Sequence, residues 1–335
     1  MDNKQLVFFI IVILLVILLI YFIWNTSSCT SCEVRNPSIK KYKSETLPSY
    51  LRSDHRPFLM APKHNKTELA SLPRNFDSRE HWSILGMKPA TDQGTCGSCW
   101  AFSASGVFGD RVKIASGGND MTQEDHISQY HLAACMKCDH KNAVCDTVCD
   151  GHYMDEVMDY IRKTGVYSFS SIQTNSNLGS DQYFCFQPRE GQNARLYKAS
   201  STYRVNPYSV NELKDKGKLE YNMQQIMYDI RAFGPVTATI RVYDPLNSKQ
   251  LLQNLYLYDG TYIYGHPWPS DPKEYDGYHA IGIMGFGVEV IKGEDVPYWI
   301  IRNSWGTGWG KDGFGKVRRG KNIAIIESDI WAPKY

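Results

Sequence analysis

Hydrophobic residues recur at helical spacing in three stretches of the chain. One stretch follows Cys99, one ends before Gly165, and one ends at Gly234-Pro235. Spacings of three and four residues gather apolar side chains on one face of an α-helix, and glycine commonly ends such a helix. The pattern predicts three helices and places Cys99 at the N-terminus of the first. The apolar positions are Ala101, Ala104, Phe108, Val112 and Ala115; Met154, Val157, Met158 and Ile161; and Met223, Ile226, Met227, Ile230 and Phe233.

Beyond Pro235 the spacing of apolar residues falls to two. Alternation of apolar and polar residues is the pattern of a strand with one buried face. Helices therefore dominate the first half of the chain and strands the second, which favours an α+β fold over a doubly wound parallel sheet. The alternating positions are Val236, Ala238, Ile240 and Val242, then Ile281 with Ile283, and Ile323 with Ile325.

The N-terminus carries a continuous apolar run. Leu6 to Trp24 comprises 19 apolar residues without a charge, which is long enough to span a bilayer. A cleaved signal peptide is the alternative, but such peptides have a shorter apolar core and a small-residue cleavage site. We predict a signal anchor within residues 1–25, which makes the membrane a partner and directs the rest of the chain into the secretory pathway. A single-pass membrane, secreted or lysosome-like location follows.

Residues 26–71 are polar and broken by four prolines, with no sustained apolar period. We predict a pro-segment or stalk here, and a folded domain over residues 72–335. Sequons begin at Asn25 and Asn65, so glycosylation is expected in a secretory lumen.

The charge of the chain excludes one class of partner. The formal net charge is only +2, and 42% of the 335 residues are hydrophobic. A chain of this length and composition buries a substantial core, whereas nothing in it predicts a nucleic-acid surface. We expect a monomer whose function resides in one site.

Nine cysteines allow several kinds of chemistry. The series from Cys135 to Cys149 reads C-x2-C-x6-C-x3-C, which is compatible with a zinc module. In an oxidising compartment such cysteines are more often disulfides, so we predict no metal and no cofactor. Cys96-Gly-Ser-Cys99 could be a redox pair, but the surrounding sequence lacks the βαβ order of a thioredoxin-like fold.

Three separate stretches resemble one enzyme family. They are QGTCGSCWAF around Cys99, GYHAIGIMGFG around His279 and NSWGTGWG from Asn303. The chain resembles the papain-like cysteine peptidases, for which C-G-[SA]-C-[WY] is a nucleophile signature. LPRNFDSREHW from Leu72, DGFGKVRRG and IIESDIWAP are similar to the cathepsin B-like branch.

This resemblance implies a papain-like two-lobe fold. A mainly helical lobe is expected over residues 72–195 and an antiparallel β-barrel-like lobe over residues 196–335, with the active-site cleft between them. By the same resemblance, three disulfides are expected, although sequence alone leaves 15 connectivities open. The expected pairs are Cys96 with Cys149, Cys135 with Cys185, and Cys138 with Cys145.

The residue types fit thiol-based acyl transfer. A helix N-terminus and a nearby imidazolium both favour a thiolate, so Cys99 is the expected nucleophile and His279 its acid-base partner. By resemblance, Asn303 orients the histidine, Gln93 contributes to an oxyanion hole and Trp305 shields the His–Asn bond. Each of these residues has a structural alternative, such as a buried inert cysteine or a core histidine.

Two departures from the family pattern concern the substrate cleft. This chain reads Cys149-Asp-Gly151-His152 where relatives read Cys-Asn-Gly-Gly, so Gly151 and His152 are expected to border the cleft. Between Val166 and Leu196 there is one cysteine and no histidine, where cathepsin B relatives carry an occluding loop with paired histidines. We predict an open cleft and endopeptidase rather than dipeptidyl carboxypeptidase action.

Glu327 matches the acidic residue at the base of the S2 pocket in the cathepsin B-like branch. That match predicts acceptance of Arg at the P2 position of a substrate, and an exposed strand carboxylate is the alternative. The prediction as a whole is a cysteine endopeptidase acting on polypeptides and made as a membrane-anchored or secreted zymogen. A catalytically silent relative with a binding or structural role is the alternative from another class.

Overall fold

The computed structural model describes residues 59–62, 64, 66–137, 148–149, 151–171, 185, 188, 194–243, 255, 258–265 and 275–335. All of them lie in the compact unit of residues 42–335. The helices are α2 (Lys66–Ala70), α3 (Ser78–His81), η2 (Ser83–Leu85), α4 (Cys99–Ser116), α5 (Gln129–Lys137), α6 (Met154–Lys163), α7 (Lys216–Phe233) and η6 (Ile323–Ile325). The strands are β1 (Leu59–Met60), β2 (Phe76–Asp77), β3 (Val166–Tyr167), β4 (Leu196–Tyr197), β5 (Ser201–Arg204), β6 (Val236–Tyr243), β7 (Tyr275–Ile291), β8 (Glu294–Arg302), β9 (Phe314–Arg318) and β10 (Ile330–Lys334).

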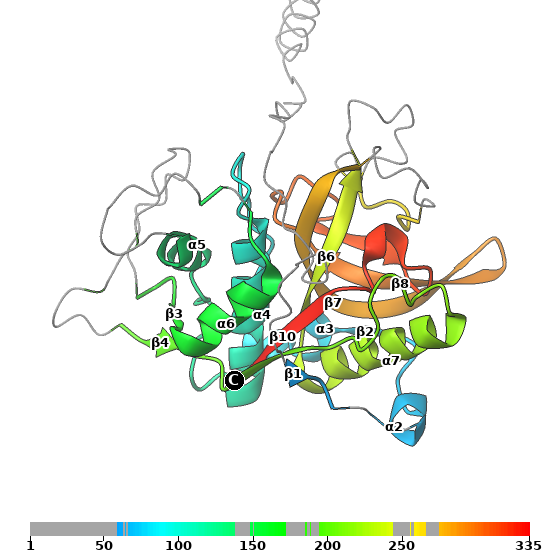
Figure 1. The fold of residues 1–335 in the computed structure, drawn as a ribbon, viewed down its shortest axis with the longest axis horizontal. Coiled ribbons are helices and arrows are strands. Elements are labelled where there is room, and N and C mark those ends of the chain that lie inside the picture. The colour runs from blue at the N-terminus through cyan, green and yellow to red at the C-terminus, as the bar shows by residue number, and fades with distance from the viewer. Residues whose placement is uncertain are drawn as a thin grey trace, which may run out of the picture. The chain divides into compact units, whose positions relative to one another are not determined.

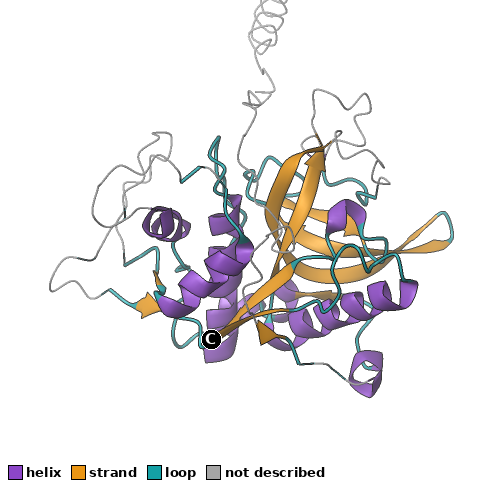
Figure 2. Ribbon diagram, viewed as in Figure 1, coloured by secondary structure: helices purple, strands orange, loops and turns teal. Residues whose placement is uncertain are grey.

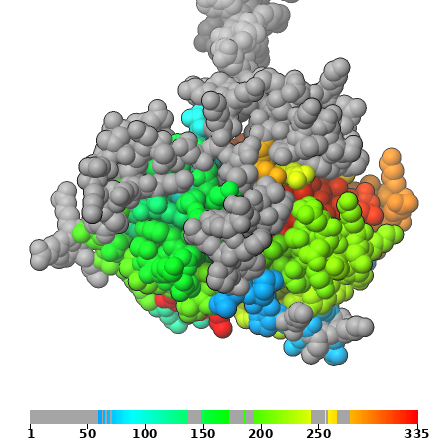
Figure 3. Space-filling model, in the orientation of Figure 1, coloured from blue at the N-terminus to red at the C-terminus, as the bar shows by residue number. Residues whose placement is uncertain are grey.

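Helices and strands separate into two lobes (Figures 1 and 2). Helices α4, α5 and α6 lie together beside the small two-stranded sheet of β3 and β4, and the large sheet lies on the other side with α7 next to it. The surface view shows the same division between the green residues of the helical lobe and the yellow-green to red residues of the second lobe (Figure 3). The predicted α+β class is confirmed.

The large sheet has the strand order β1-β5-β10-β6-β7-β8-β9, and β2 adds to β7. All of these pairs are antiparallel except β1 with β5. The two long strands β7 and β8 form one hairpin, whose turn at Lys292-Gly293 has positive φ at both residues. Within the described residues the sheet does not close between β1 and β9, so the second lobe is a curved open sheet rather than a barrel.

The three predicted helices are confirmed. They are α4, α6 and α7, and α4 begins at Cys99 as predicted. The apolar face of α6 is fully buried, since Met154, Val157, Met158 and Ile161 have no exposed area. The strands predicted from the alternations that start at Val236 and Ile281 are β6 and part of β7.

The strand predicted at Ile323 and Ile325 is wrong, because these residues form the short 3-10 helix η6. Asn322, Ala324 and Ile325 all have positive φ, which a strand does not allow. The side chain of Asn322 holds this turn, since its Oδ1 accepts hydrogen bonds from Glu327 N and Ser328 Oγ, both at 3.0 Å.

Each end of the folded domain packs in the lobe opposite to that expected from its position in the sequence. Phe76 belongs to the core of the sheet lobe and pairs with Phe286 of β7. Trp331 belongs to the core of the helical lobe, and Tyr335 donates a hydrogen bond to Asp120 at 2.8 Å. The two lobes therefore exchange their terminal segments, and a single cut near residue 195 describes only their main bodies.

The predicted signal anchor lies outside the described residues. In the part of the chain that the structure describes, no helix has both the length and the apolar character needed to cross a bilayer. The end of the predicted pro-segment is described, and it packs on the folded domain. Ala61 N donates to Arg204 O at 2.9 Å, and His64 stacks on Tyr228 with ring centroids 3.6 Å apart.

Candidate active site

The N-terminal half of α4 packs against β6 and β7. Ser103 lies 3.3 Å from Thr237 between the two hydroxyl oxygens, and a Cβ placed at Gly282 of β7 would lie 3.6 Å from Val107. Ala280 shares a buried hydrophobic cluster with Cys99. Because His279 directly precedes Ala280, the start of α4 faces the part of β7 that carries this histidine.

His279 is held by Asn303. The imidazole Nε2 and the Asn303 Oδ1 are 2.7 Å apart, and both residues are buried, with 4% and 3% of their surface exposed. Asn303 follows the last residue of β8, and β8 pairs with β7, so adjacent strands bring the two residues together. Asn303 Oδ1 also accepts from Ser304 N at 2.8 Å, which fixes the amide orientation.

This hydrogen bond selects a tautomer of His279. An amide oxygen only accepts, so the proton of the neutral ring lies on Nε2 and the lone pair lies on Nδ1. A ring held in this state can take a proton at Nδ1 and return it later. Trp305 stacks on the same ring, with centroids 4.5 Å apart and planes inclined by 27°, and so covers one of its faces.

Gln93 joins the same group of residues. Its backbone N donates to Ser304 O at 2.8 Å, and its Oε1 accepts from Ser304 Oγ at 2.5 Å. Its Nε2 donates one hydrogen to Cys96 O at 2.8 Å. An amide nitrogen has two hydrogens, so one more can be directed at a substrate oxygen. Sequence reasoning missed Ser304, because its contact to Gln93 joins residues 211 positions apart.

Cys99 is buried and, among the described cysteines, is the one outside a disulfide. Disulfides join Cys96 to Cys149 and Cys135 to Cys185, which are two of the pairs implied by the family resemblance. The third expected pair, Cys138 with Cys145, lies outside the described residues. Cys96 is bonded to Cys149 rather than to Cys99, so the redox-pair alternative is wrong. The zinc alternative is also wrong for this state, because Cys135 and Cys149 are engaged with different partners.

The Cys96–Cys149 disulfide also places Gly151 and His152, which are expected to border the cleft, near the nucleophile motif around Cys99. Gly151 has a φ of +69°, and His152 meets the Trp100 ring edge-on with centroids 5.3 Å apart. His152 Nδ1 lies 3.0 Å from Glu156 Oε2 one helical turn away. His152 therefore stands beside the residue that follows Cys99.

Glu327 is fully buried, so its interpretation as an exposed strand carboxylate is wrong. Its Oε1 accepts from Trp299 Nε1 at 2.9 Å and from Gly320 N at 2.6 Å, and its Oε2 accepts from Asn322 N at 2.5 Å. Burial raises the pKa of this carboxyl group, and these donors oppose the shift. The contacts tie Glu327 to the turn before η6 rather than to the group around Cys99 and His279.

A charged network that sequence reasoning did not identify lies behind the site. Arg302 donates from Nη1 to Asp110 Oδ2 at 2.8 Å and to Lys88 O at 2.7 Å. A Cβ at Gly106 would lie 2.6 Å from Arg302 Nη2, so a larger residue there would displace this guanidinium group. Lys88 Nζ donates to Gln129 Oε1 at 2.7 Å, and burial lowers the pKa of Lys88 to about 7. The one signal of this network in the sequence is that the charged Arg302 directly follows the apolar residues Trp299 to Ile301.

Comparisons with known proteins identify the family of the chain. Residues 72–334 match the model of a family described as papain family cysteine protease. The chain is 33% identical to a cathepsin B-like cysteine proteinase of Schistosoma japonicum, an alignment that covers 78% of this chain and 72% of the relative. It is 31% identical to a gut-specific cysteine proteinase of Caenorhabditis elegans, over 79% of this chain and 74% of the relative. It is also 33% identical to cathepsin B-like cysteine proteinase 3 of that organism, but spans only 65% of its length.

Solved structures share the fold. A procathepsin B from Trypanosoma congolense aligns with a TM-score of 0.63 at 22% identity, over 88% of each chain. A digestive procathepsin L 3 from Tenebrio molitor aligns with a TM-score of 0.55 at 23% identity, over 88% of this chain and 77% of the other. At these identities the likeness shows a papain-like fold and nothing more specific.

Proposed function

Since this chain belongs to the papain family of cysteine proteases, in its cathepsin B-like branch, we propose that it hydrolyses peptide bonds with Cys99 as the nucleophile. The observation that carries the proposal is the buried His279–Asn303 hydrogen bond beside the start of α4. It leaves an imidazole nitrogen available for proton transfer next to a helix that begins with a cysteine outside any disulfide.

The reaction begins with proton transfer from Cys99 to His279 Nδ1. The partial positive charge at the N-terminus of α4 favours the resulting thiolate, and so does the imidazolium. The thiolate attacks the scissile carbonyl carbon, and the C–N bond then breaks as His279 gives its proton to the leaving amine. Water, deprotonated by His279, hydrolyses the thioester, which releases a carboxylic acid and restores the thiol. Asn303 keeps the ring in the required tautomer throughout.

Two N–H groups are proposed to bind the oxyanion. These are the Cys99 backbone N–H and the second Nε2–H of Gln93, whose side chain is fixed by Ser304 and Cys96. A donor that is already oriented costs no reorganisation when negative charge develops, and one such donor typically contributes about 3 kcal/mol to transition-state binding.

Polypeptides are the proposed substrates, and endopeptidase action remains our proposal. It rests on the sequence between Val166 and Leu196, which has no histidine of the kind an occluding loop requires. We further propose that Gly151 and His152 border the cleft, because Cys149 is bonded to the nucleophile motif. Digestion of an end-blocked peptide tests this. Internal cleavage supports the proposal, whereas release of C-terminal dipeptides alone from an unblocked peptide contradicts it.

We also propose that the protein is made as a zymogen with a pro-segment in residues 26–71, held by the predicted anchor in residues 1–25 in a secretory or lysosome-like compartment. β1 pairs with β5 and His64 stacks on Tyr228, so the last part of this segment must dissociate from the sheet lobe before the segment can be removed. Mass spectrometry of the N-terminus after acid activation tests the boundary. A new N-terminus at Leu72 supports removal, and an intact chain with full activity contradicts it.

Labelling with an epoxide that alkylates thiolates distinguishes an active enzyme from a silent binding protein. We expect one adduct, on Cys99, with loss of peptidase activity in proportion to labelling. The Cys99→Ser variant should bind no label and hydrolyse no peptide. Activity that survives complete labelling of Cys99 would contradict the proposal.

A further inference from the structure

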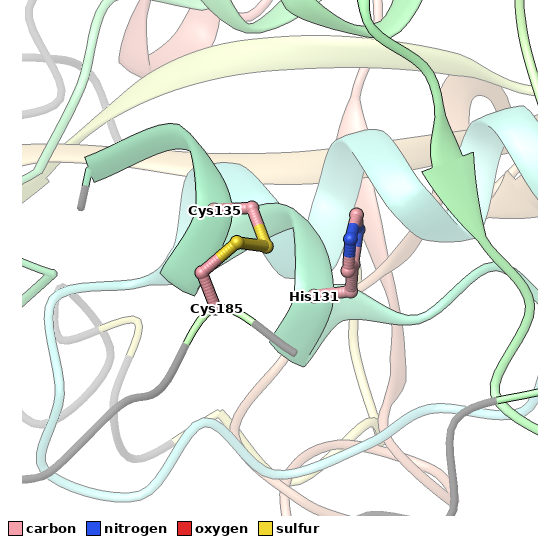
Figure 4. A group of neighbouring side chains, drawn as sticks. All are labelled: His131, Cys135 and Cys185. Carbon is pink, nitrogen blue, oxygen red and sulfur yellow. A yellow bond between two sulfur atoms is a disulfide. The ribbon is translucent and has the colours of Figure 1, made fainter. Parts of the chain in front are cut away.

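A second group of chemically reactive side chains lies in the helical lobe, apart from the residues proposed for catalysis. His131 and Cys135 are four residues apart on α5, so both lie on one face of the helix, and Cys185 reaches them from a separate segment (Figure 4). One ring nitrogen of His131 and both sulfur atoms lie within 4.8 Å of one another. In this state the two sulfurs form a disulfide.

His131 is the unusual member of the group. Its side chain is buried, with 2% of its surface exposed, and neither ring nitrogen has a hydrogen-bond partner among the residues that the structure describes. Tyr167 meets the ring edge-on, with centroids 5.1 Å apart, which satisfies neither nitrogen. Buried polar groups are nearly always hydrogen-bonded, so an exception beside two sulfurs calls for an explanation.

We infer that His131, Cys135 and Cys185 form a binding site for Zn²⁺ or a similar thiophilic divalent ion when the Cys135–Cys185 disulfide is reduced. Imidazole nitrogen and thiolate sulfur are the donors that zinc prefers, and two thiolates on a tetrahedral zinc stand about 3.8 Å apart. The three donors are therefore close to the required spacing once the sulfurs separate. With three protein donors, a water molecule completes the coordination.

Formation of the site by the ion requires a reductant such as a thiol and no other co-reactant. Two equivalents of a thiol reduce the disulfide, giving the Cys135 and Cys185 thiols and the disulfide of the reductant. Cys185 is only partly buried whereas Cys135 is buried, so the reductant attacks at Cys185. The ion then displaces one proton from each thiol, and His131 binds through its lone pair without releasing a proton. Oxidation by a disulfide reverses the sequence and expels the ion.

This site differs from the zinc module considered from sequence. That module required Cys149, which is bonded to Cys96, and did not include His131 or Cys185. The inference is independent of the proposed peptidase activity, because none of the three residues belongs to the group around Cys99 and His279. It follows that the same polypeptide has the Cys135–Cys185 disulfide in an oxidising compartment and a metal-binding site at these residues in a reducing one.

Co²⁺ titration of the full chain tests the inference. A Cys99→Ser background removes the nucleophilic thiol as a competing ligand and makes the result independent of catalysis. After reduction with a phosphine, which does not compete for the metal as a thiol would, we expect one Co²⁺ to bind with a thiolate-to-cobalt charge-transfer band. The unreduced protein should show no such band.

Three variants of that background identify the ligands. His131→Ala should weaken binding at least tenfold, and Cys185→Ser should remove about half of the charge-transfer intensity. Cys149→Ser is the matched control, since it removes one thiol of the other described disulfide, and it should leave the affinity within twofold. If His131→Ala does not fold, as judged by circular dichroism, His131→Gln keeps a polar side chain of similar size and should give the same weakening. The inference would be overturned if the reduced protein bound no Co²⁺, or if the unreduced protein bound Co²⁺ equally well. It would also be overturned if the loss of His131 left the affinity unchanged.

Discussion

Arg302 Nη1 donates hydrogen bonds to the backbone carbonyl of Lys88 at 2.7 Å and to Asp110 Oδ2 at 2.8 Å, and the backbone N–H of Lys88 donates to Asp110 Oδ1 at 2.8 Å, so both residues contact one buried carboxylate. Burial of the Lys88 ammonium group, and after it the charge of Arg302, lower the pKa of Lys88 to about 7. The unfolded chain has the ordinary value of 10.5. Between these two values the unfolded state binds more protons than the folded state.

The free energy of unfolding should therefore rise as the pH increases from about 7 towards 10, because a proton is bound in the unfolded state only. The contribution of Lys88 approaches about 1.4 kcal/mol per pH unit within that window. Denaturant unfolding at several pH values checks this in the wild-type protein and in Lys88→Met, in which the slope should fall. The exposed Lys214→Met is the control and should retain the wild-type slope. Equal slopes in wild type and Lys88→Met would show that Lys88 does not titrate in this range.

Asn303→Ala should lower kcat roughly 10- to 100-fold, which corresponds to about 1.4–2.7 kcal/mol of transition-state stabilisation. The reason is that His279 loses the acceptor that selects its tautomer, while Cys99 and the cleft remain. Steady-state kinetics over a pH series measure the effect, and the acid limb of the profile should shift as well. An unchanged kcat and pH profile would mean that the His279–Asn303 bond is structural only.

Gln93→Ala should lower kcat by roughly 10²-fold or more with little change in KM, as expected for a donor that acts mainly on the oxyanion. Gln224 lies on the surface of α7 and bonds to Glu220 of the same helix, so Gln224→Ala is the control. Epoxide labelling of Cys99 in Gln93→Ala serves as a second readout, and the label should still attach. A rise in KM alone would assign Gln93 to substrate binding instead.

Glu327→Gln should destabilise the fold, because an amide offers one acceptor oxygen where the turn before η6 needs two. The loss should be about 1–3 kcal/mol in denaturant unfolding. We expect the ratio of activities towards Arg-P2 and Phe-P2 substrates to stay constant, because the carboxylate is buried under its own donors. A fall in the Arg-P2 ratio would instead support the S2 role suggested by the family match.

The sequence predicts the long elements of this fold well and the short ones poorly. The stripes of α4, α6 and α7 run over several turns, so only a helix accommodates them. The alternation at Ile323 and Ile325 covers three residues, which is too short to separate a strand from the turn that Asn322 imposes. Long, strongly periodic patterns therefore deserve more weight than local alternation.

The proposed catalytic residues were accessible from sequence because each lies in a distinctive motif. The support around them was not, since Ser304 and the network of Lys88, Asp110 and Arg302 depend on contacts between residues far apart in the chain. The burial of Glu327 was missed for the same reason. Only the tertiary structure brings Trp299 and Gly320 to its carboxylate.

The exchange of terminal segments between the lobes determines how the molecule can come apart. Phe76 near the start of the folded domain completes the core of the sheet lobe, and Trp331 near its end completes the core of the helical lobe. Neither half of the gene, expressed by itself, would encode a complete core. The two lobes must therefore melt as a single cooperative unit, and trimming either end of the domain would weaken the lobe that is built mainly from the opposite half of the chain.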